Sequence, residues 1–119
     1  MGTIKDEHLI LSCGEREPLD DIRLEIITAI HDGFADEGYA PNYADYVSPV
    51  LSALANGGYY LFIPADGSKE GWGTSNVMDD VRELIRSRIV YHNAKGKDKI
   101  SVICVIEGDY EKLRAEDWL

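Results

Sequence analysis

A glycine-rich segment between a strand-like run and a helical pattern is the first place in this sequence where residue types and spacing could do chemistry. Residues 64–76 read PADGSKEGWGTSN, after the apolar run YYLFI and before VMDDVRELIRSRI. A strand, a glycine-rich loop and a helix in this order often bind phosphate, because free backbone N–H groups and the helix dipole both attract an anion. The glycine spacing decides whether this segment matches a known phosphate-binding motif.

The spacing matches neither common nucleotide motif. The P-loop requires a glycine, four residues and then Gly-Lys-Ser/Thr, but Trp72 and Gly73 follow Gly67 at this distance. The dinucleotide motif G-x-G-x-x-G begins at Gly71 and Gly73 but has Asn76 where the third glycine belongs. Nucleotide binding by this loop is therefore kept only as a second hypothesis.

The expected start of the following helix also disfavours an anion. Asn76 is a predicted N-cap, and Asp79 three residues later could complete a capping box. Asp79 and Asp80 would then place two carboxylates at the positive end of the helix dipole, where a phosphate meets like charge. Lys69 offers one compensating charge in the loop.

Three loop residues remain as candidate contacts, namely Lys69, Glu70 and Trp72. Lys69 and Glu70 are adjacent, and we expect them to be solvated. Trp72 lies between two glycines, which allow the backbone path that turns a bulky ring inward. We expect its ring to pack on the sheet or on the following helix; in the alternative it projects as a contact for a partner.

Hydrophobic periodicity predicts one domain of the α/β or α+β class, in which a small sheet of three or four strands packs against two main helices. The length of 119 residues fits a single domain. The predicted strands are residues 7–13, 59–64 and 100–107, and the predicted helices are residues 18–37 and 77–92. The last two strands flank a helix and could pair in parallel, while a mixed α+β sheet is equally compatible.

Two further segments give weaker patterns. A helix could follow Asn42, but an interior proline costs about 3 kcal/mol, so Pro49 predicts a short helix beginning near Ser48, or a kinked one. Residues 109–119 are expected to form a final helical turn or two.

Charge is the strongest compositional signal. The net charge is −10, and residues 1–46 hold eleven acids against three bases, a net of −8, while residues 47–119 carry a net of −2. Binding nucleic acid through its phosphates needs a positive surface, so direct nucleic-acid binding is disfavoured. An acidic surface suits a basic partner, although it also serves solubility alone.

The candidate binding residues lie in this acidic half. They are the acids Asp20, Asp21, Glu25, Asp32, Asp36 and Glu37, together with Tyr39, Tyr43 and Tyr46. Tyrosine beside acidic residues is an interface composition suited to arginine-rich surfaces. The alternative, weighed equally, is that one or two of the tyrosine rings cover a helix junction.

Nothing in the sequence predicts a cofactor or a catalytic centre. Cys13 and Cys104 lie in apolar runs and are expected to be free structural thiols. His8, His31 and His92 fall on different elements and lack the spacing of a helical metal site. We therefore expect no metal and no cofactor, and we favour a role without catalysis over an enzymatic one.

The segment of residues 59–110 resembles a group of small uncharacterised proteins common in bacteriophage genomes. The shared features are an apolar strand, a Pro-Asp-Gly-Ser-Lys-Glu-Gly-Trp segment, an acidic helix and a strand ending near Gly-Asp. The matching residues here are Pro64, Asp66, Gly67, Ser68, Lys69, Glu70, Gly71, Trp72, Gly108 and Asp109, with Ala65 as an extra residue. The resemblance implies a phage or prophage origin and no assigned activity.

The leading hypothesis is a non-enzymatic, acidic phage accessory protein. It would use its acidic N-terminal half to bind a host protein with a basic surface, with defence components among the candidates. The sequence has no signal peptide and no apolar run of the roughly 20 residues that span a bilayer, so we expect the bacterial cytoplasm and no membrane partner. The alternatives are small-molecule or nucleotide binding by the 64–76 loop, and a virion structural component.

Overall fold

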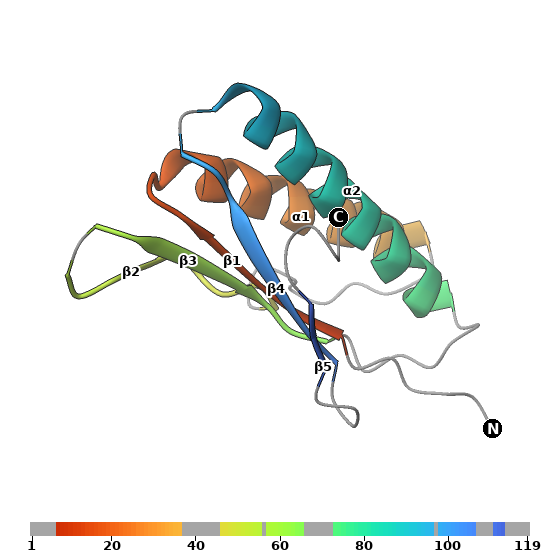
Figure 1. The fold of residues 1–119 in the computed structure, drawn as a ribbon. Coiled ribbons are helices and arrows are strands. Elements are labelled where there is room, and N and C mark those ends of the chain that lie inside the picture. Colours follow the sequence, from red (N-terminus) through yellow and green to blue (C-terminus); the bar gives the residue numbers. More distant parts are fainter. Residues whose placement is uncertain are drawn as a thin grey trace.

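The computed structural model describes residues 7–36, 46–55, 57–65, 73–96, 98–106 and 111–113. Its elements are β1 (Glu7–Cys13), α1 (Glu17–Asp36), β2 (Leu51–Ser52), β3 (Tyr59–Ile63), α2 (Gly73–Lys95), β4 (Ser101–Ile106) and β5 (Glu111–Leu113). Both helices cover the same face of one sheet, which gives a two-layer α+β arrangement (Figure 1). The predicted fold class is confirmed.

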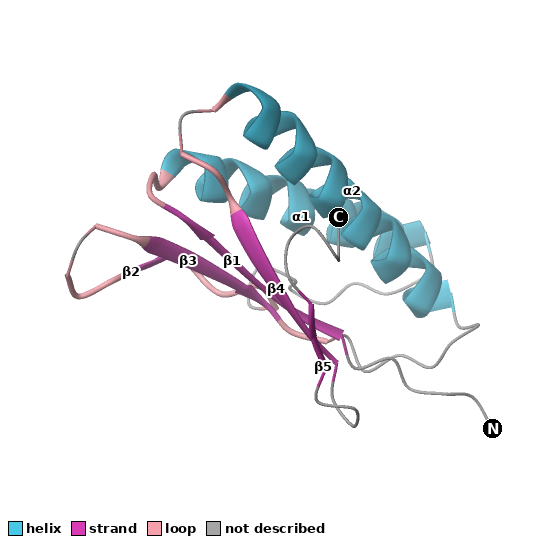
Figure 2. Ribbon diagram, in the orientation of Figure 1, coloured by secondary structure: helices cyan, strands magenta, loops and turns pink. Residues whose placement is uncertain are grey.

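The sheet is antiparallel at every pairing, in the strand order β2-β3-β1-β4-β5. The three predicted strands form its centre, and one short strand, β2 or β5, lies at each edge (Figure 2). The direct parallel pairing of residues 59–64 with 100–107 is wrong, because β1 lies between β3 and β4. Since β3 and β4 both run antiparallel to β1, they are parallel to each other, and β3-α2-β4 is a βαβ unit split by β1.

The core lies between the sheet and the helices. Alternate residues of β1 are buried on the helix side, as a half-covered strand requires. The helices contribute residues at steps of three and four, the pattern that predicted them. The fully buried side chains include Leu9, Leu11, Leu19, Ile26, Ile30, Leu61, Met78, Val81, Ile85, Ile89 and Ile100.

The helix expected near Ser48 is replaced by an edge strand. Ser48 donates its backbone N–H to the carbonyl of Phe62 at 3.1 Å, and its Oγ accepts the Phe62 N–H at 2.8 Å. Leu51 then pairs with Tyr60. Pro49 explains the outcome, because a residue without an N–H breaks a helix interior but is tolerated beside an edge strand.

The start of α2 differs from the prediction. The helix begins at Gly73, so Asn76 lies inside it and is not the N-cap. The first turn of α2 contains no acidic residue, and Asp79 and Asp80 lie beyond it. The argument from like charge at the helix start is therefore wrong, and the case against a phosphate site rests on the glycine spacing alone.

The C-terminal prediction is also corrected where the structure describes it. Glu111–Leu113 is a strand that pairs with β4, with Leu113 opposite Cys104. Without a neighbour, β4 would form an open edge of the sheet with unpaired backbone N–H and C=O groups. A paired strand forms hydrogen bonds with these groups, whereas a helical turn cannot. Among the helices of the described residues, none is both long and apolar enough to cross a membrane.

Candidate protein-binding surface

Helix α1 is divided lengthwise into an apolar side and an acidic side. Leu19, Ile22, Ile26 and Ile30 are buried against the sheet and α2. At about 100° per residue, five acids fall within roughly 140° on the opposite side of the helix. This acidic face consists of Glu17, Asp20, Asp21, Glu25 and Asp32. Four of the six predicted acidic site residues are thus brought together on one exposed surface.

Two of these carboxylates have basic partners. Asp20 lies 3.2 Å from Nε of Arg16, one turn earlier in the chain, and both side chains are about half exposed. Glu25 lies 2.8 Å from Nη2 of Arg88, which joins α1 to α2. Exposed pairs of this kind contribute only about 0–1 kcal/mol, so a stronger basic partner can compete for either carboxylate.

The other three carboxylates are less compensated. Among the described residues, Asp32 has its ion-pair contact with the adjacent His31, 3.4 Å away, and both side chains are largely exposed. Glu17 and Asp21 are exposed and make no ion pair with another described residue. The acidic face therefore retains net negative charge that no described cation neutralises.

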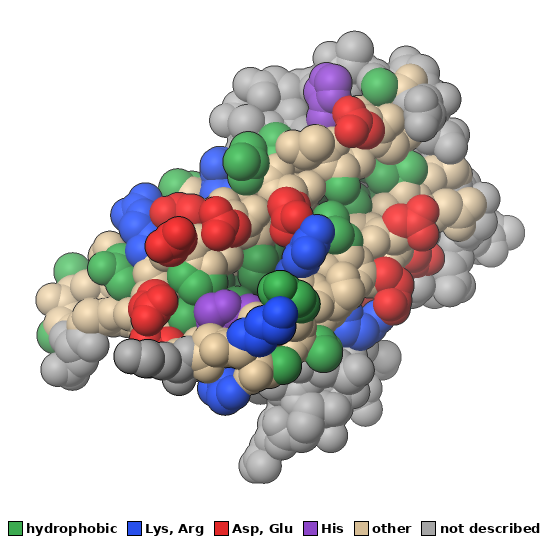
Figure 3. Space-filling model, turned by 90° about the horizontal axis from the view of Figure 1, so that it is seen from above, with side chains coloured by type: hydrophobic (Ala, Val, Ile, Leu, Met, Phe, Trp, Pro, Cys, Tyr) green, Lys and Arg blue, Asp and Glu red, His purple; other side chains and the backbone are tan. Residues whose placement is uncertain are grey.

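An open groove of about 560 Å³ adjoins the acidic face, between the first half of α1 and the last half of α2. Its apolar lining includes Leu24 and Tyr91, which are 66% and 59% exposed. Acids from α1 line one side, and bases from α2 line the other. Viewed from above the helices, acidic and basic side chains alternate with hydrophobic ones over this layer (Figure 3).

Tyr91 is held in position within the groove. Lys95 donates from Nζ to the Tyr91 hydroxyl at 3.0 Å, and the same ammonium lies 4.4 Å from the ring centroid. The spacing of Arg88, Tyr91 and Lys95 at steps of three and four could have identified this face of α2 in the sequence. Leu24 gave no such signal, because it interrupts the acidic pattern of α1.

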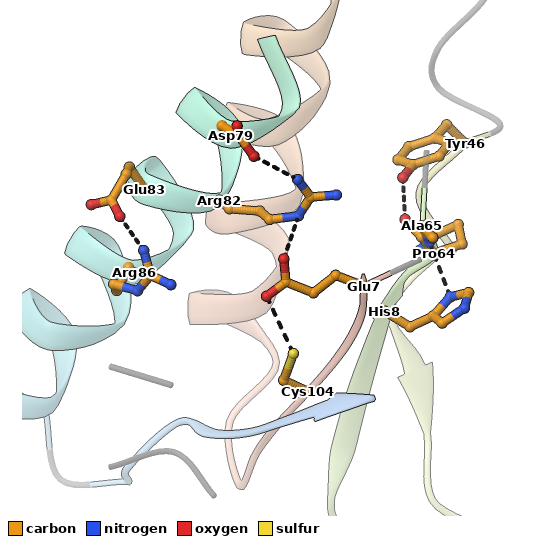
Figure 4. Close-up of polar contacts among 10 residues, drawn as sticks. All are labelled: Glu7, His8, Tyr46, Pro64, Ala65, Asp79, Arg82, Glu83, Arg86 and Cys104. Carbon is orange, nitrogen blue, oxygen red and sulfur yellow. Dashed lines mark hydrogen bonds and ion pairs between the residues drawn. The ribbon is translucent and has the colours of Figure 1, made fainter. Parts of the chain in front are cut away.

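A buried polar network ties the other end of α2 to the sheet (Figure 4). The Arg82 side chain, 7% exposed, lies between Glu7 at 3.3 Å and Asp79 at 3.1 Å. Cys104 donates from Sγ to Oε1 of Glu7 at 3.3 Å. This network could not be predicted from the sequence, because Glu7 is far from Arg82 along the chain.

The network determines the chemistry of the Cys104 thiol. Burial is the largest cause, followed by the hydrogen bond to Glu7 and its negative charge, and together they raise the pKa of Cys104 to about 12. A thiol with so high a pKa stays protonated at neutral pH and is a poor nucleophile. Cys13 and Cys104 are both buried and free, which confirms the prediction of free structural thiols.

Tyr46 holds the end of β3. Its hydroxyl donates to the carbonyl of Pro64, and the next N–H, of Ala65, donates to Nδ1 of His8 at 3.0 Å (Figure 4). The Tyr46 ring is partly buried against the core. Tyr46 therefore fits the alternative in which a tyrosine ring covers part of the core. It covers the end of β3, however, and not a helix junction.

The remaining predicted site residues cannot be placed on this surface. The Asp36 side chain and the residues Glu37, Tyr39, Tyr43, Lys69, Glu70 and Trp72 lie outside the described part of the chain. The described His, Cys, Asp and Glu residues include no group of three that could hold a metal ion. Comparisons with protein-family models, with curated proteins and with solved structures find no match.

Proposed function

We propose that this chain is a non-enzymatic accessory protein of phage origin that binds a basic host protein. The acidic face of α1 and the adjoining groove form the proposed binding surface. The observation that carries the proposal is the position of Glu17, Asp21 and Asp32, which are exposed on the same side of one helix and are not neutralised by a described lysine or arginine.

The charge of the two helices supports a partner that approaches α1. Helix α1 holds six acids against Arg23, a net of −5, whereas α2 holds three acids against four bases, a net of +1. Complementary charge raises association rates and suppresses binding of acidic partners. A basic segment therefore has its most favourable approach along α1.

The groove supplies the apolar contact that charge alone lacks. Binding energy in protein interfaces comes mainly from a few desolvated apolar or aromatic contacts, with a charged rim around them. Leu24 and Tyr91 are exposed in the groove, and Asp21 and Glu25 lie on the α1 side of it. A partner segment with an apolar residue flanked by arginine or lysine fits this arrangement.

The phage origin rests on the sequence resemblance of residues 59–110, whose Pro-Asp-Gly-Ser-Lys-Glu-Gly-Trp segment lies at residues 64–72. A phage protein made during infection meets the proteins of the host cell, so a host protein is the proposed target. A defence component with a surface that binds nucleic acid has the required positive charge.

Capture from a bacterial lysate tests the proposal. The wild-type chain is compared with the double variant Asp21→Asn/Asp32→Asn, and with Asp80→Asn as a control that removes an exposed carboxylate from α2. We expect the double variant to lose the captured protein and Asp80→Asn to retain it. Raising the salt concentration should release the protein, because exposed charges are then screened. Equal capture by all three chains, or capture insensitive to salt, contradicts the proposal.

Small-molecule binding is a second candidate function, favoured by the size of the groove. Its volume of about 560 Å³ lies within the range of known ligand sites, and charges of both signs lie on its rim. A thermal-shift screen with nucleotides and zwitterionic metabolites tests this candidate, since a ligand at 100 times its dissociation constant adds about 2.7 kcal/mol of stability. The absence of a shift at millimolar ligand removes it.

A further inference from the structure

The face of the sheet opposite the helices is apolar and exposed. We call it the open sheet face; from β2 to β4 its described residues are His8, Ile10, Ser12, Leu51, Tyr60, Phe62, Ser101, Ile103 and Val105. Leu51, Tyr60, Phe62 and Ile103 are 51%, 44%, 39% and 45% exposed. Neither helix covers this side of the sheet (Figure 1). Large apolar side chains gathered on an exposed surface are typical of an interaction site.

The strand register makes this surface continuous. Ile10 on the central strand pairs with Phe62 of β3 on one side and with Ile103 of β4 on the other. The three side chains therefore form one row across the sheet, with strands about 4.8 Å apart. Leu51 and Tyr60 begin the adjacent row, since they are paired across β2 and β3.

From β2 to β4, charged residues are depleted on the open sheet face, and Lys112 of β5 pairs with Val105 at its edge. From β2 to β4, its nine described positions include no Asp, Glu, Lys or Arg. Charged residues make up 29% of the chain, so nine positions chosen at random would carry about three of them. Such depletion of charged residues is typical of the core of a protein interface.

We infer that a second copy of this chain covers the open sheet face, in a symmetric sheet-on-sheet dimer. Charge selects this occupant. Two chains of net charge −10 repel each other wherever their acidic surfaces meet. Contact through the part of the open sheet face from β2 to β4 brings together two surfaces without like charges and places both acidic faces on the outside. A basic partner is instead attracted to the acidic face of α1.

The rows suit a two-fold contact. Stacked sheets lie about 10 Å apart, with strands inclined by about 30°. A two-fold axis midway between the sheets, running roughly in the direction of β1, would place Phe62 of each copy over Ile103 of the other, so that both ends of the apolar row are covered. The face spans four strands and about five residues, roughly 19 by 17 Å. Because this is smaller than a standard interface, we expect a dimer that dissociates on dilution.

Sedimentation equilibrium of the full chain over about 5 to 500 μM tests the inference, a range chosen for the small interface. We expect the wild-type mass to rise from that of one chain towards that of two. Ile103→Glu should keep the chain monomeric throughout, because it buries a carboxylate against Phe62 of the other copy. Val90→Glu is the matched control, since Val90 is 53% exposed on α2, and it should behave as wild type.

Ser101→Glu provides a second test that leaves the apolar packing intact, because Ser101 is exposed and lies on the same face. It should also weaken the dimer, and circular dichroism checks that both variants fold. A wild-type chain that remains monomeric at 500 μM overturns the inference. A dimer that survives both Ile103→Glu and Ser101→Glu also overturns it. Loss of the dimer in Val90→Glu alone would overturn it as well, because the contact would then lie on the helix layer.

Discussion

Gly33 of α1 packs against Val77 of α2, and a methyl group at this position has no room. A Cβ built on Gly33 would lie 2.6 Å from Cγ1 and 3.2 Å from Cγ2 of Val77. From the sequence, Gly33 only weakens its helix, by about 1 kcal/mol relative to alanine. The structure gives the glycine a positive role, because it allows the two helices to approach closely.

We therefore expect Gly33→Ala to destabilise the protein by about 1–2 kcal/mol, since overpacking outweighs the gain in helix propensity. Urea unfolding measures the change. Val77→Ala is the matched background, because its Cβ would lie 3.5 Å from the new methyl group, an ordinary contact. In that background Gly33→Ala should be neutral or stabilising. The same loss in both backgrounds would show that Val77 is not the cause.

The Cys104 thiol makes stability depend on pH in the alkaline range. Its pKa is raised from 9.0 to about 12 in the folded protein. The folded state therefore holds this proton more tightly than the unfolded state, and the resulting stabilisation is complete below pH 9 and is lost as pH rises towards 12. Urea midpoints at several values above pH 8 should fall more steeply for wild type than for Cys104→Ala. Cys13→Ala controls for the loss of a buried thiol, and an identical slope in Cys104→Ala excludes the linkage.

At the scale of the elements, Arg82 connects α2 to β1. Replacing Arg82 with methionine keeps most of the volume but leaves the carboxylate of Glu7, which is 18% exposed, without this cation. Loss of one partner of a buried pair costs about 3–5 kcal/mol. We expect Arg82→Met to approach this cost in urea unfolding.

Two comparisons separate the buried pair from general effects of the substitution. Arg86→Met removes an arginine that is more exposed than Arg82 and pairs with the exposed Glu83, and it should cost less than Arg82→Met. Adding Glu7→Gln to Arg82→Met should recover part of the lost stability, because the side chain that faced Arg82 then carries no charge. An equal loss in Arg82→Met and Arg86→Met would contradict the role assigned to the pair.

The elements that the sequence predicted are those whose identity depends on local pattern. The steps of three and four from Leu19 to Ile30 fix the apolar side of α1. The position of β1 between β3 and β4 depends instead on contacts between distant residues, such as Leu9 with Ile63 and Cys104. β2 contains two residues and β5 contains three. Strands this short are stabilised by pairing with a neighbouring strand, and their intrinsic β-propensity contributes little.

The candidate surface was predictable to the same extent. The acids of α1 could be named as candidates from the sequence, but the sequence alone leaves open whether they share one face; the structure places Asp20, Asp21, Glu25 and Asp32 on one side of the helix. The groove could not, because Leu24 and Tyr91 come from two helices whose contact is a tertiary property. The open sheet face has the same origin, since only the strand register aligns Ile10 with Phe62 and Ile103.

At the scale of the whole molecule, charge and apolar surface lie on opposite sides. The helix layer carries the acidic face, and the open sheet face has no charged side chain among its described residues from β2 to β4. A dimer through the sheets would expose two acidic faces in opposite directions. Such a dimer could bind two basic partners, or two sites of one large partner, with the gain in affinity that two linked sites provide.

Salt should act in opposite directions on the two proposed contacts. The Debye length falls from about 10 Å at 0.1 M to about 3 Å at 1 M salt, which weakens attraction between the acidic face and a basic partner. The same screening reduces repulsion between two copies of net charge −10, so the sheet-on-sheet dimer should become tighter. Capture assays and sedimentation equilibrium between 0.05 and 0.5 M sodium chloride, about a tenfold change in ionic strength, measure the two responses. If both contacts weaken with salt, the dimer is held by charge and the open sheet face is not its interface.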